Sequence, residues 1–359
     1  MNTIHENKDL QNLLNTFSVD QGNYTFSKIN QGYINDTFLV LEHGQPLYIL
    51  QRINSVVFSN VPAVMSNMSN TLSYLKDKEY STVALVPTKT GELFCELKHQ
   101  DYWRLIRYVP NSIAYDIALN TKVAHEAGKI LGKFHSLLQN ATSDQFVDTI
   151  PQFHDLKLRK VQFQEAMNNA SQERLHKAIV AIEFVTFIFP QLSELSSLKL
   201  PSRICHNDTK LNNILFSKKT NQALCFIDLD TIMKGYFYYD FGDLVRTIAN
   251  TGKEDEKNHD KITFDKIMFE SLLDGLKTTS NFLTPPELKS LPLGVVFMPF
   301  IHGLRALTDY LNNDTYYKVS YVDQNLDRSL SLLDFSKKAL LQIHYIEAMV
   351  TKKLQASGN

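Results

Sequence analysis

The chain has 359 residues, of which 43% are hydrophobic, and a formal net charge of −1. This size predicts two domains or one large bilobed domain, and the near-neutral charge does not favour a nucleic-acid partner. Three cysteines without a CxxC pair favour a reducing compartment over a disulfide or zinc scaffold. The polar start and the short apolar run at 292–301 predict neither a signal peptide nor a membrane span. We therefore expect a cytoplasmic protein that works as a monomer.

The first 110 residues are predicted to be rich in β-structure. Short apolar runs bounded by turn residues predict strands at 37–42, 47–53, 82–87, 92–97 and 102–109. The first two would form a hairpin around HGQP, and the third and fourth would flank a turn at Lys89–Gly91. Apolar residues at helical spacing predict one helix over 61–79.

The remainder of the chain is predicted to be mainly helical. Helical spacing and a capping box at Thr284–Glu287 predict helices at 123–138, 155–170, 172–187, after 284 and at 328–354. The exception is the segment 203–230, in which short strands flank a polar loop. We therefore predict an α+β fold of two lobes: a β-rich lobe over 1–110 and a larger helical lobe over 111–359.

The polar loop is the main functional signal. It reads HNDTKLNN over 206–213, and the stretch IDLD follows at 227–230. An aspartate can accept a proton from a hydroxyl while a nearby lysine offsets charge on a transferring group. Asn213 and Asp228 offer the oxygen ligands that Mg²⁺ prefers. The spacing matches the H-R-D-x-K-x-x-N loop and the D-F-G aspartate of protein kinases, so it predicts phosphoryl transfer. The alternative is a polar loop in which Asp208 only caps a turn.

Nearby polar residues are first given structural roles. His206 is expected to hold the loop through backbone hydrogen bonds. In YDFGD at 239–243, Asp240 or its neighbour is expected to cap a helix. Asp243 and Arg246 would share one face of that helix, where they could reach the active site or form a surface salt bridge.

On these residues the sequence resembles the aminoglycoside phosphotransferase and choline kinase superfamily, which has a protein-kinase-like bilobed fold. Within it, the sequence is similar to the bacterial N-acetylhexosamine 1-kinases. The resemblance spans nearly the whole chain, through YILQ at 48–51, FHD at 153–155, HNDTKLNNIL at 206–215, IDLDTIM at 227–233, DFGD at 240–243 and DYL with a downstream tyrosine at 309–317.

The resemblance implies a role for each matching residue. Asp208 would be the catalytic base that accepts the proton of the sugar's anomeric hydroxyl, with Lys210 near the transferring phosphoryl group. The implied Mg²⁺ ligands are Asn213 and Asp228, supported by Asp230. The implied sugar-binding residues are Asp208, Asp243, Arg305 and Tyr317. Arg305 could equally pair with Asp309, four residues further along its helix.

The nucleotide side departs from the protein kinases. The glycine-rich loop is reduced to QGYINDT at 31–37, and Gln51 replaces the usual strand lysine. Since glutamine carries no charge, the phosphates would depend on Mg²⁺ and Lys210, or on Arg52 or Arg107. The ATP-binding residues that the resemblance implies are Gly32, Asn35, Thr37, Gln51, Arg107, Tyr108 and Val109.

Three functions are therefore weighed. The leading one is an ATP- and Mg²⁺-dependent kinase that phosphorylates the anomeric hydroxyl of N-acetylglucosamine or N-acetylgalactosamine, giving the sugar 1-phosphate. A second is a kinase of the same fold for another hexose, an aminoglycoside or choline. A third is a nucleotide-binding pseudokinase, which Gln51 favours and the intact set of Asp208, Lys210, Asn213 and Asp228 opposes.

Overall fold

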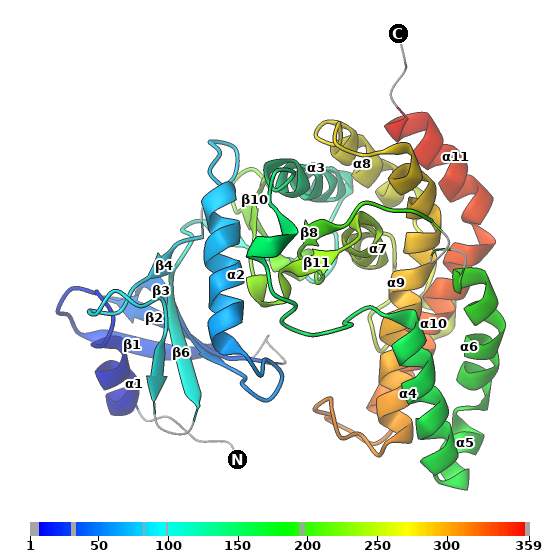
Figure 1. Ribbon diagram of the computed structural model, residues 1–359, viewed down its shortest axis with the longest axis horizontal. Coiled ribbons are helices and arrows are strands. Elements are labelled where there is room, and N and C mark those ends of the chain that lie inside the picture. Colours follow the sequence, from blue (N-terminus) through cyan, green and yellow to red (C-terminus); the bar gives the residue numbers. More distant parts are fainter. Residues whose placement is uncertain are drawn as a thin grey trace.

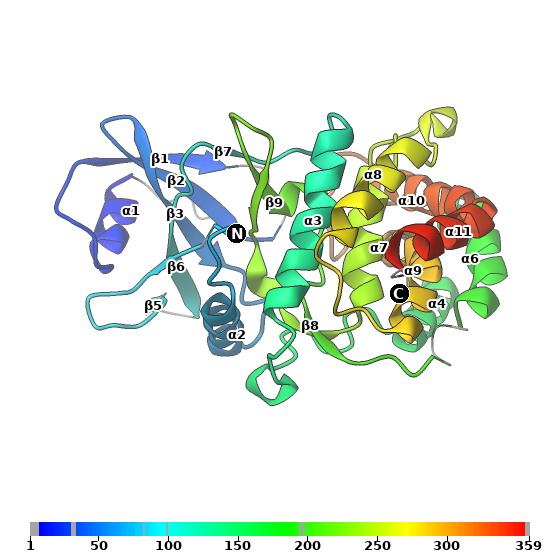
Figure 2. The same cartoon turned by 90° about the horizontal axis from the view of Figure 1, so that it is seen from above.

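An antiparallel sheet and a group of helices lie side by side in the computed structural model (Figures 1 and 2). The structure describes residues 7–29, 34–81, 83–97, 100–193, 195 and 198–355. We call the elements up to β6 the N-terminal lobe and those from β7 onward the C-terminal lobe. The mixed α+β architecture that the sequence predicts is confirmed.

The N-terminal lobe is built around the sheet. Its elements are α1 (Asn7–Leu14), β1 (Tyr24–Ile29), β2 (Asp36–Glu42), β3 (Gln45–Ile53), α2 (Val61–Tyr74), β4 (Leu85–Val86), β5 (Cys95–Leu97) and β6 (Asp101–Arg107). The sheet order is β1-β2-β3-β6-β4, with β5 also paired to β6, and all pairs are antiparallel.

The predicted hairpin of β2 and β3 and the predicted turn between β4 and β5 are both confirmed. β2 and β3 pair with each other, but β4 and β5 both pair with β6. The turn between β4 and β5 does form, since the N–H of Thr88 donates to Glu92 O at 2.7 Å. β4 and β5 lie one after the other along the same edge of β6, since β3 occupies its other edge. This long-range pairing leaves no local signal in the sequence.

The sheet has two differently covered faces. Because side chains alternate along a strand, Leu50 of β3 and Leu105 of β6 share one face, which packs with Leu14 of α1 in a separate small core. On the other face, α2 runs between the sheet and the C-terminal lobe (Figure 1). The buried residues of α2 belong to the large core that also contains the C-terminal helices.

The C-terminal lobe combines helices with short strand pairs. Its elements are β7 (Ser112–Ile113), α3 (Thr121–Leu137), α4 (Leu156–Asn169), α5 (Gln172–Lys177), α6 (Ile179–Leu192), β8 (Arg203–Cys205), β9 (Ile214–Ser217), β10 (Ala223–Phe226), β11 (Met233–Gly235), α7 (Phe237–Ile248), α8 (Lys266–Lys277), α9 (Pro285–Leu311), α10 (Gln324–Leu341) and α11 (Ile343–Leu354). The predicted helices over 172–187 and 328–354 each prove to be two helices, which meet at Ala178 and Gln342.

Helix α9 is the central helix of this lobe. It begins with the predicted capping box of Thr284 and Glu287. It is long and apolar enough to cross a membrane, but 83% of its most apolar window is buried inside the protein. Helix α7 approaches it closely, because a Cβ atom on Gly242 would lie only 2.1 Å from the carbonyl oxygen of Gly294. This contact fixes the helix that supports the polar loop.

Candidate active site

The loop after β8 carries the predicted catalytic residues, and α7 holds it in place. The fully buried carboxylate of Asp240 accepts hydrogen bonds from the backbone N–H groups of His206 (2.8 Å) and Asn207 (2.7 Å). His135 of α3 contacts the same carboxylate at 2.8 Å. Asn207 has a φ of 63°, a conformation that costs free energy in a residue with a side chain and needs support from its surroundings. The backbone is thus fixed immediately before Asp208.

Asp240 does not have the capping role that the sequence suggested. Helix α7 begins at Phe237, and Tyr236 at its N-cap makes no side-chain cap bond, so Asp240 lies inside the helix and turns toward the loop. The donor atoms of His135, Cys205 and Asp240 lie within 4.8 Å of one another. Burial raises the pKa of the Cys205 thiol, and the other two groups are bonded to each other. The cluster therefore supports the loop and does not suit a metal ion.

Two histidines tie the loop to its neighbours. His206 Nε2 donates to the carbonyl oxygen of Ile227 at 2.9 Å, and Thr231 Oγ1 donates to the carbonyl oxygen of His206 at 2.7 Å. His154 Nε2 donates to the carbonyl oxygen of Asn207 at 3.2 Å. His206 thus holds the loop through backbone hydrogen bonds, as predicted, and it links the loop to the IDLD stretch.

Asp208 lies between a cation and a carboxamide. Lys210 Nζ is 3.0 Å from Asp208 Oδ2, and Asn213 Nδ2 donates to the same oxygen at 2.9 Å. Burial favours the protonated acid, but the charge of Lys210 outweighs it and lowers the pKa of Asp208 below its ordinary value. The carboxylate is therefore ionised at neutral pH and has its second oxygen, Oδ1, available to accept a proton.

Asp228 lies beside Asn213 although 15 residues separate them in the sequence. The N–H of Ile227 donates to the carbonyl oxygen of Asn213 at 2.8 Å, which joins the end of β10 to the loop. Asp228 itself is in the left-handed conformation, with φ 60° and ψ 55°. Loss of hydration among the surrounding protein atoms, followed by repulsion from the negative charge of Asp230, raises the pKa of Asp228 to about 6.

The donor atoms around Asp228 suit a divalent cation. Among the described residues, none forms a hydrogen bond or ion pair with the Asp228 carboxylate. Asn213 donates its amide hydrogens to Asp208, so its carboxamide oxygen is left to act as a ligand. An exposed carboxylate without a bonded cation, in a turn that a backbone hydrogen bond joins to the residue with the free carboxamide oxygen, is the type of site that binds Mg²⁺.

Asp230 is differently placed from the other predicted metal ligands. Its Oδ1 forms a buried ion pair with Arg104 of β6, and its Oδ2 accepts a hydrogen bond of 2.7 Å from Asn35 Nδ2. Both oxygens are thus bonded to side chains of the N-terminal lobe. This arrangement fits the supporting role implied for Asp230. It also shows that the side chain of Asn35, which the resemblance assigns to ATP binding, is bonded to Asp230.

The predicted nucleotide residues fall on different sides of the sheet. Thr37 and Gln51 are register partners, and Gln51 Nε2 donates to Thr37 Oγ1 at 3.1 Å. Arg107 lies on the opposite face, where its guanidinium is 5.9 Å from the ring of Tyr48. Arg52 also lies on that face and pairs with Asp101. Neither arginine faces Gln51, so neither substitutes for the missing lysine.

The connector between the lobes follows β6. The N–H of Tyr108 donates to the carbonyl oxygen of Leu47 at 2.9 Å, and the carbonyl oxygen of Val109 accepts a hydrogen bond of 2.6 Å from Ser112 Oγ. These contacts hold the connector against the sheet. Gly32 lies outside the described residues.

The predicted acceptor residue Asp243 belongs to a buried charge network. Asp243 Oδ1 accepts a hydrogen bond of 2.6 Å from Arg246 Nε and lies 3.2 Å from His302 Nε2. Arg246 also pairs with Glu254, which in turn pairs with Arg328 at 3.0 Å. Arg246 and His302 hold the pKa of Asp243 well below its ordinary value despite burial. Its second oxygen, Oδ2, is buried without a hydrogen-bond partner.

The alternative salt bridge between Arg305 and Asp309 does not form. The guanidinium of Arg305 lies 4.7 Å from the ring of Phe153. Asp309 instead accepts backbone hydrogen bonds from Thr315 (3.0 Å), Tyr316 (2.8 Å) and Tyr317 (2.9 Å). It therefore shapes the loop that presents Tyr317, whose ring lies 4.8 Å from the guanidinium of Arg328.

Sequence analysis did not recognise how four residues organise this site. Arg104, Asp240, His154 and Asp309 are all buried polar residues, with 0–5% of their surface exposed. For Asp240, the available signal is its place in a helix between apolar neighbours, where a charge needs a partner. Arg104 gives the same signal within the apolar strand YWRLIRYV.

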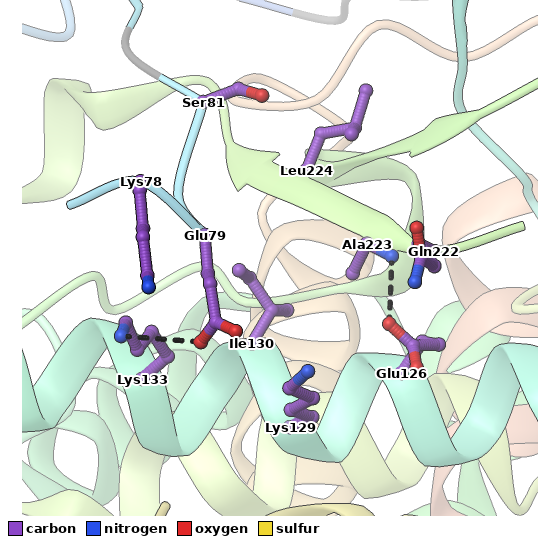
Figure 3. A pocket seen from close by; sticks show the side chains of 10 residues that line it. All are labelled: Lys78, Glu79, Ser81, Glu126, Lys129, Ile130, Lys133, Gln222, Ala223 and Leu224. Carbon is purple, nitrogen blue, oxygen red and sulfur yellow. Dashed lines mark hydrogen bonds and ion pairs between the residues drawn. The ribbon is translucent and has the colours of Figure 1, made fainter.

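A cavity of about 280 Å³ lies elsewhere, between α3, β10 and the segment after α2 (Figure 3). It is lined by Lys78, Lys129 and Lys133, but Glu79 reaches Lys133 at 3.7 Å and Glu126 accepts a hydrogen bond from the backbone of Ala223. None of the residues of the HNDTKLNN loop lines it. The candidate active site is therefore the group of residues around this loop, where Asp230 is bonded to side chains of the N-terminal lobe.

The fold and this set of residues define a phosphotransferase of the protein-kinase-like class. The sequence model of the phosphotransferase enzyme family, APH, matches residues 25–259. Since this match covers more than half of the chain, the protein belongs to that family.

Solved structures with a similar fold span nearly the whole chain. A microcompartment-associated aminopropanol kinase is 16% identical, with a TM-score of 0.64 over 96% of this chain and 99% of that one. An amicoumacin kinase in complex with AMP-PNP and Ca²⁺ is 14% identical, with a TM-score of 0.62 over 93% and 92%. An ethanolamine kinase of Plasmodium vivax is 12% identical, with a TM-score of 0.55 over 86% and 81%.

Proposed function

We propose that the protein transfers the γ-phosphate of ATP to the anomeric hydroxyl of an N-acetylhexosamine and releases the sugar 1-phosphate and ADP. N-acetylglucosamine and N-acetylgalactosamine are the acceptors that the motif resemblance implies. Cytoplasmic location and a monomeric state remain predictions of the sequence.

Asp208 is the base of the proposed reaction. The anomeric oxygen attacks the γ-phosphorus, its proton passes to Asp208, and the bond to the β,γ-bridging oxygen breaks so that ADP leaves. The lowered pKa of Asp208 keeps it ready to accept the proton. Lys210 stays charged because Asp208 and Asp228 raise its pKa despite burial, and this charge stabilises the transferring phosphoryl group.

Asn213 and Asp228 would hold Mg²⁺ at this site. Bound there, the ion would neutralise charge on the β- and γ-phosphates. Asp230 would then act indirectly, because its oxygens are bonded to Arg104 and Asn35. The nucleotide itself would lie between this pair and the connector, near Tyr108 and Val109, as the resemblance implies.

The charge network around Asp243 favours a neutral acceptor rich in hydroxyl groups. An amine would need an unpaired carboxylate, but Asp243 and Glu254 are both paired with arginines. Burial lowers the pKa of His154 to about 3 and that of His302 to about 4, so both rings are neutral at pH 7. The unpartnered Asp243 Oδ2 and His154 Nδ1 can each accept a hydrogen bond from a hydroxyl group.

The buried, unpartnered Oδ2 of Asp243 is the observation that carries the choice of acceptor. Leaving such an oxygen unpaired costs free energy that a bound hydroxyl group would recover. Arg305, which covers the ring of Phe153, further disfavours a cationic acceptor such as choline or an aminoglycoside. The restriction to an N-acetylhexosamine rests on the motif resemblance.

Phosphorus NMR tests the proposal directly. Purified protein would be incubated with Mg·ATP and N-acetylglucosamine, with N-acetylgalactosamine, glucose, choline and kanamycin in parallel and Asp208→Asn as the inactive control. We expect a sugar 1-phosphate signal coupled to the anomeric proton for the two N-acetylhexosamines. ADP formed only with choline or kanamycin would overturn the acceptor assignment, and no transfer to any acceptor would support the pseudokinase.

A further inference from the structure

An arginine from the neighbouring strand fills the place of the missing lysine. Gln51 and Arg104 are register partners on β3 and β6. Gln51 Oε1 accepts hydrogen bonds from Arg104 Nε (3.0 Å) and Nη2 (2.9 Å). Together with Thr37, which accepts from Gln51, these side chains form a hydrogen-bonded row across three adjacent strands.

The guanidinium of Arg104 is buried and needs a negative partner. Only 1% of Arg104 is exposed, and its Nη1 lies 3.9 Å and 3.6 Å from the sulfur atoms of Met65 and Met68 on α2. In protein kinases, a glutamate on the helix at this place pairs with the strand lysine. Helix α2 has no acidic residue, since it reads VPAVMSNMSNTLSY. The ion pair therefore forms with Asp230 of the other lobe.

This ion pair acts on the turn that carries the proposed metal ligand Asp228. Asp230 lies two residues further along the chain, in the turn Leu229–Thr231, and 2% of its side chain is exposed. Its other oxygen is bonded to Asn35, and its backbone carbonyl accepts a hydrogen bond of 3.1 Å from Thr149. The left-handed backbone of Asp228 is thus held from one side by the N-terminal lobe.

We propose that Arg104 is a positioning residue for the phosphate and Mg²⁺ site, which it orients by holding Asp230 and, through it, the Asp228 turn. In protein kinases, the corresponding ion pair joins a strand lysine and a helix glutamate within one lobe. Here the ion pair of Arg104 and Asp230 joins the two lobes instead. This inference deepens the proposed function and rests on it.

Arg104 acts through Asp230 and does not itself reach the phosphates. Three of its nitrogen atoms are bonded to Gln51 and Asp230, and the guanidinium is covered by Met65 and Met68. Loss of this support should therefore weaken metal binding, as second-layer changes do at metal sites. It should leave the acceptor side, which belongs to the C-terminal lobe, unchanged.

The test measures Mn²⁺ binding by electron paramagnetic resonance in the presence of a non-hydrolysable ATP analogue. Wild type would be compared with two variants. Arg104→Met keeps a similar side-chain length and removes the charge, whereas Arg104→Lys keeps the charge and loses the pair of hydrogen bonds to Gln51. We expect Arg104→Met to bind Mn²⁺ at least about tenfold more weakly and Arg104→Lys to fall between the two. Arg52→Met is the matched control, since Arg52 lies on the opposite sheet face and pairs with Asp101; its Mn²⁺ affinity should equal that of wild type.

Folding must be separated from positioning. A purely structural role would lower the melting temperature of Arg104→Met while the folded protein bound Mn²⁺ normally, and that result would overturn the proposal. If Arg104→Met does not fold, Arg104→Gln decides, because it also removes the charge that pairs with Asp230 while it keeps a polar group beside Gln51; wild-type Mn²⁺ affinity in that variant would equally overturn the proposal. Failure of the wild type to bind Mn²⁺ with any nucleotide would instead count against the proposed function itself.

Discussion

The carboxylate of Asp240 lies 2.7 Å from the backbone nitrogen of Asn207, the residue immediately before Asp208. The same carboxylate accepts the N–H of His206 at 2.8 Å. Two backbone groups of the loop are thus fixed by one buried side chain on α7, so the position of the proposed base depends on a residue that does not take part in the reaction.

Replacement of Asp240 by asparagine should loosen the loop. An amide offers only one acceptor oxygen, so its NH₂ group would face one of the two backbone N–H donors. We expect a loss of about 3 kcal/mol in the free energy of unfolding and a fall in kcat of about a hundredfold from misplacement of Asp208. Urea unfolding and steady-state kinetics measure the two effects. Asp265→Asn, at the N-cap of α8, is the control and should leave kcat unchanged.

Replacement of Asp208 by asparagine should separate chemistry from binding. The amide retains the shape of the side chain and cannot accept a proton, so kcat should fall about a thousandfold or more. Binding of Mn²⁺ with an ATP analogue should remain within a few-fold of wild type, because Asp228 and the carboxamide oxygen of Asn213 are unchanged. Wild-type turnover in this variant would exclude Asp208 as the base.

Asp243→Asn should act on the acceptor and not on the nucleotide. Its Oδ2 is the buried oxygen without a partner, and the variant loses the charge that Arg246 and His302 face. We expect the KM for the sugar to rise about tenfold while the KM for ATP stays constant. Glu254→Gln is the matched control, since Glu254 belongs to the same charge network and is linked to Asp243 only through Arg246. Equal effects on the sugar KM in both variants would contradict a direct contact between Asp243 and the sugar.

Stability should decline as the pH falls below about 6.5. The ordinary pKa of histidine is 6.5, and burial lowers that of His154 to about 3 in the folded protein. Between these values the unfolded chain is protonated at this residue and the folded chain is not. The stabilising contribution is therefore complete above pH 6.5 and is lost at about 1.4 kcal/mol per pH unit as the pH falls toward 3.

Urea unfolding at pH 7.5, 6.5 and 5.5 measures this effect. His154→Gln should show a flatter dependence than wild type, while His344→Gln, whose histidine side chain is 96% exposed, should not. His302 should contribute in the same direction, since its pKa is lowered to about 4. An unchanged slope in His154→Gln would contradict the prediction.

Gly242→Ala should disturb the packing of α7 against α9. The new Cβ atom would lie 2.1 Å from the carbonyl oxygen of Gly294, so one of the helices has to move. We expect a loss of about 3 kcal/mol in the free energy of unfolding. Gly132→Ala is the control in another helix, because the nearest atom there is the side-chain oxygen of Thr279, which can rotate, and not a backbone atom. Equal stability of the two variants would contradict the close contact.

The sequence predicted most elements but not all of their partners. Helices such as α3 and α9 were recognised because apolar residues at helical spacing and caps are local signals. The pairing of β4 and β5 with β6 was not recognised, since strand partners are chosen by burial across distant segments. The breaks at Ala178 and Gln342 were also missed, because the apolar pattern continues across both.

By itself, the sequence determined the class of this protein, a phosphotransferase. Asp208, Lys210 and Asn213 lie within six consecutive residues, so a short loop is enough to bring their side chains together. Their spacing was therefore enough to predict a kinase. Only the tertiary structure decided how these groups are held. Arg104 and Asp230 are 126 residues apart, and neither shows its partner in the sequence. A buried charge requires an opposite charge or hydrogen bonds nearby, but the burial that imposes this requirement exists only once the lobes have packed together.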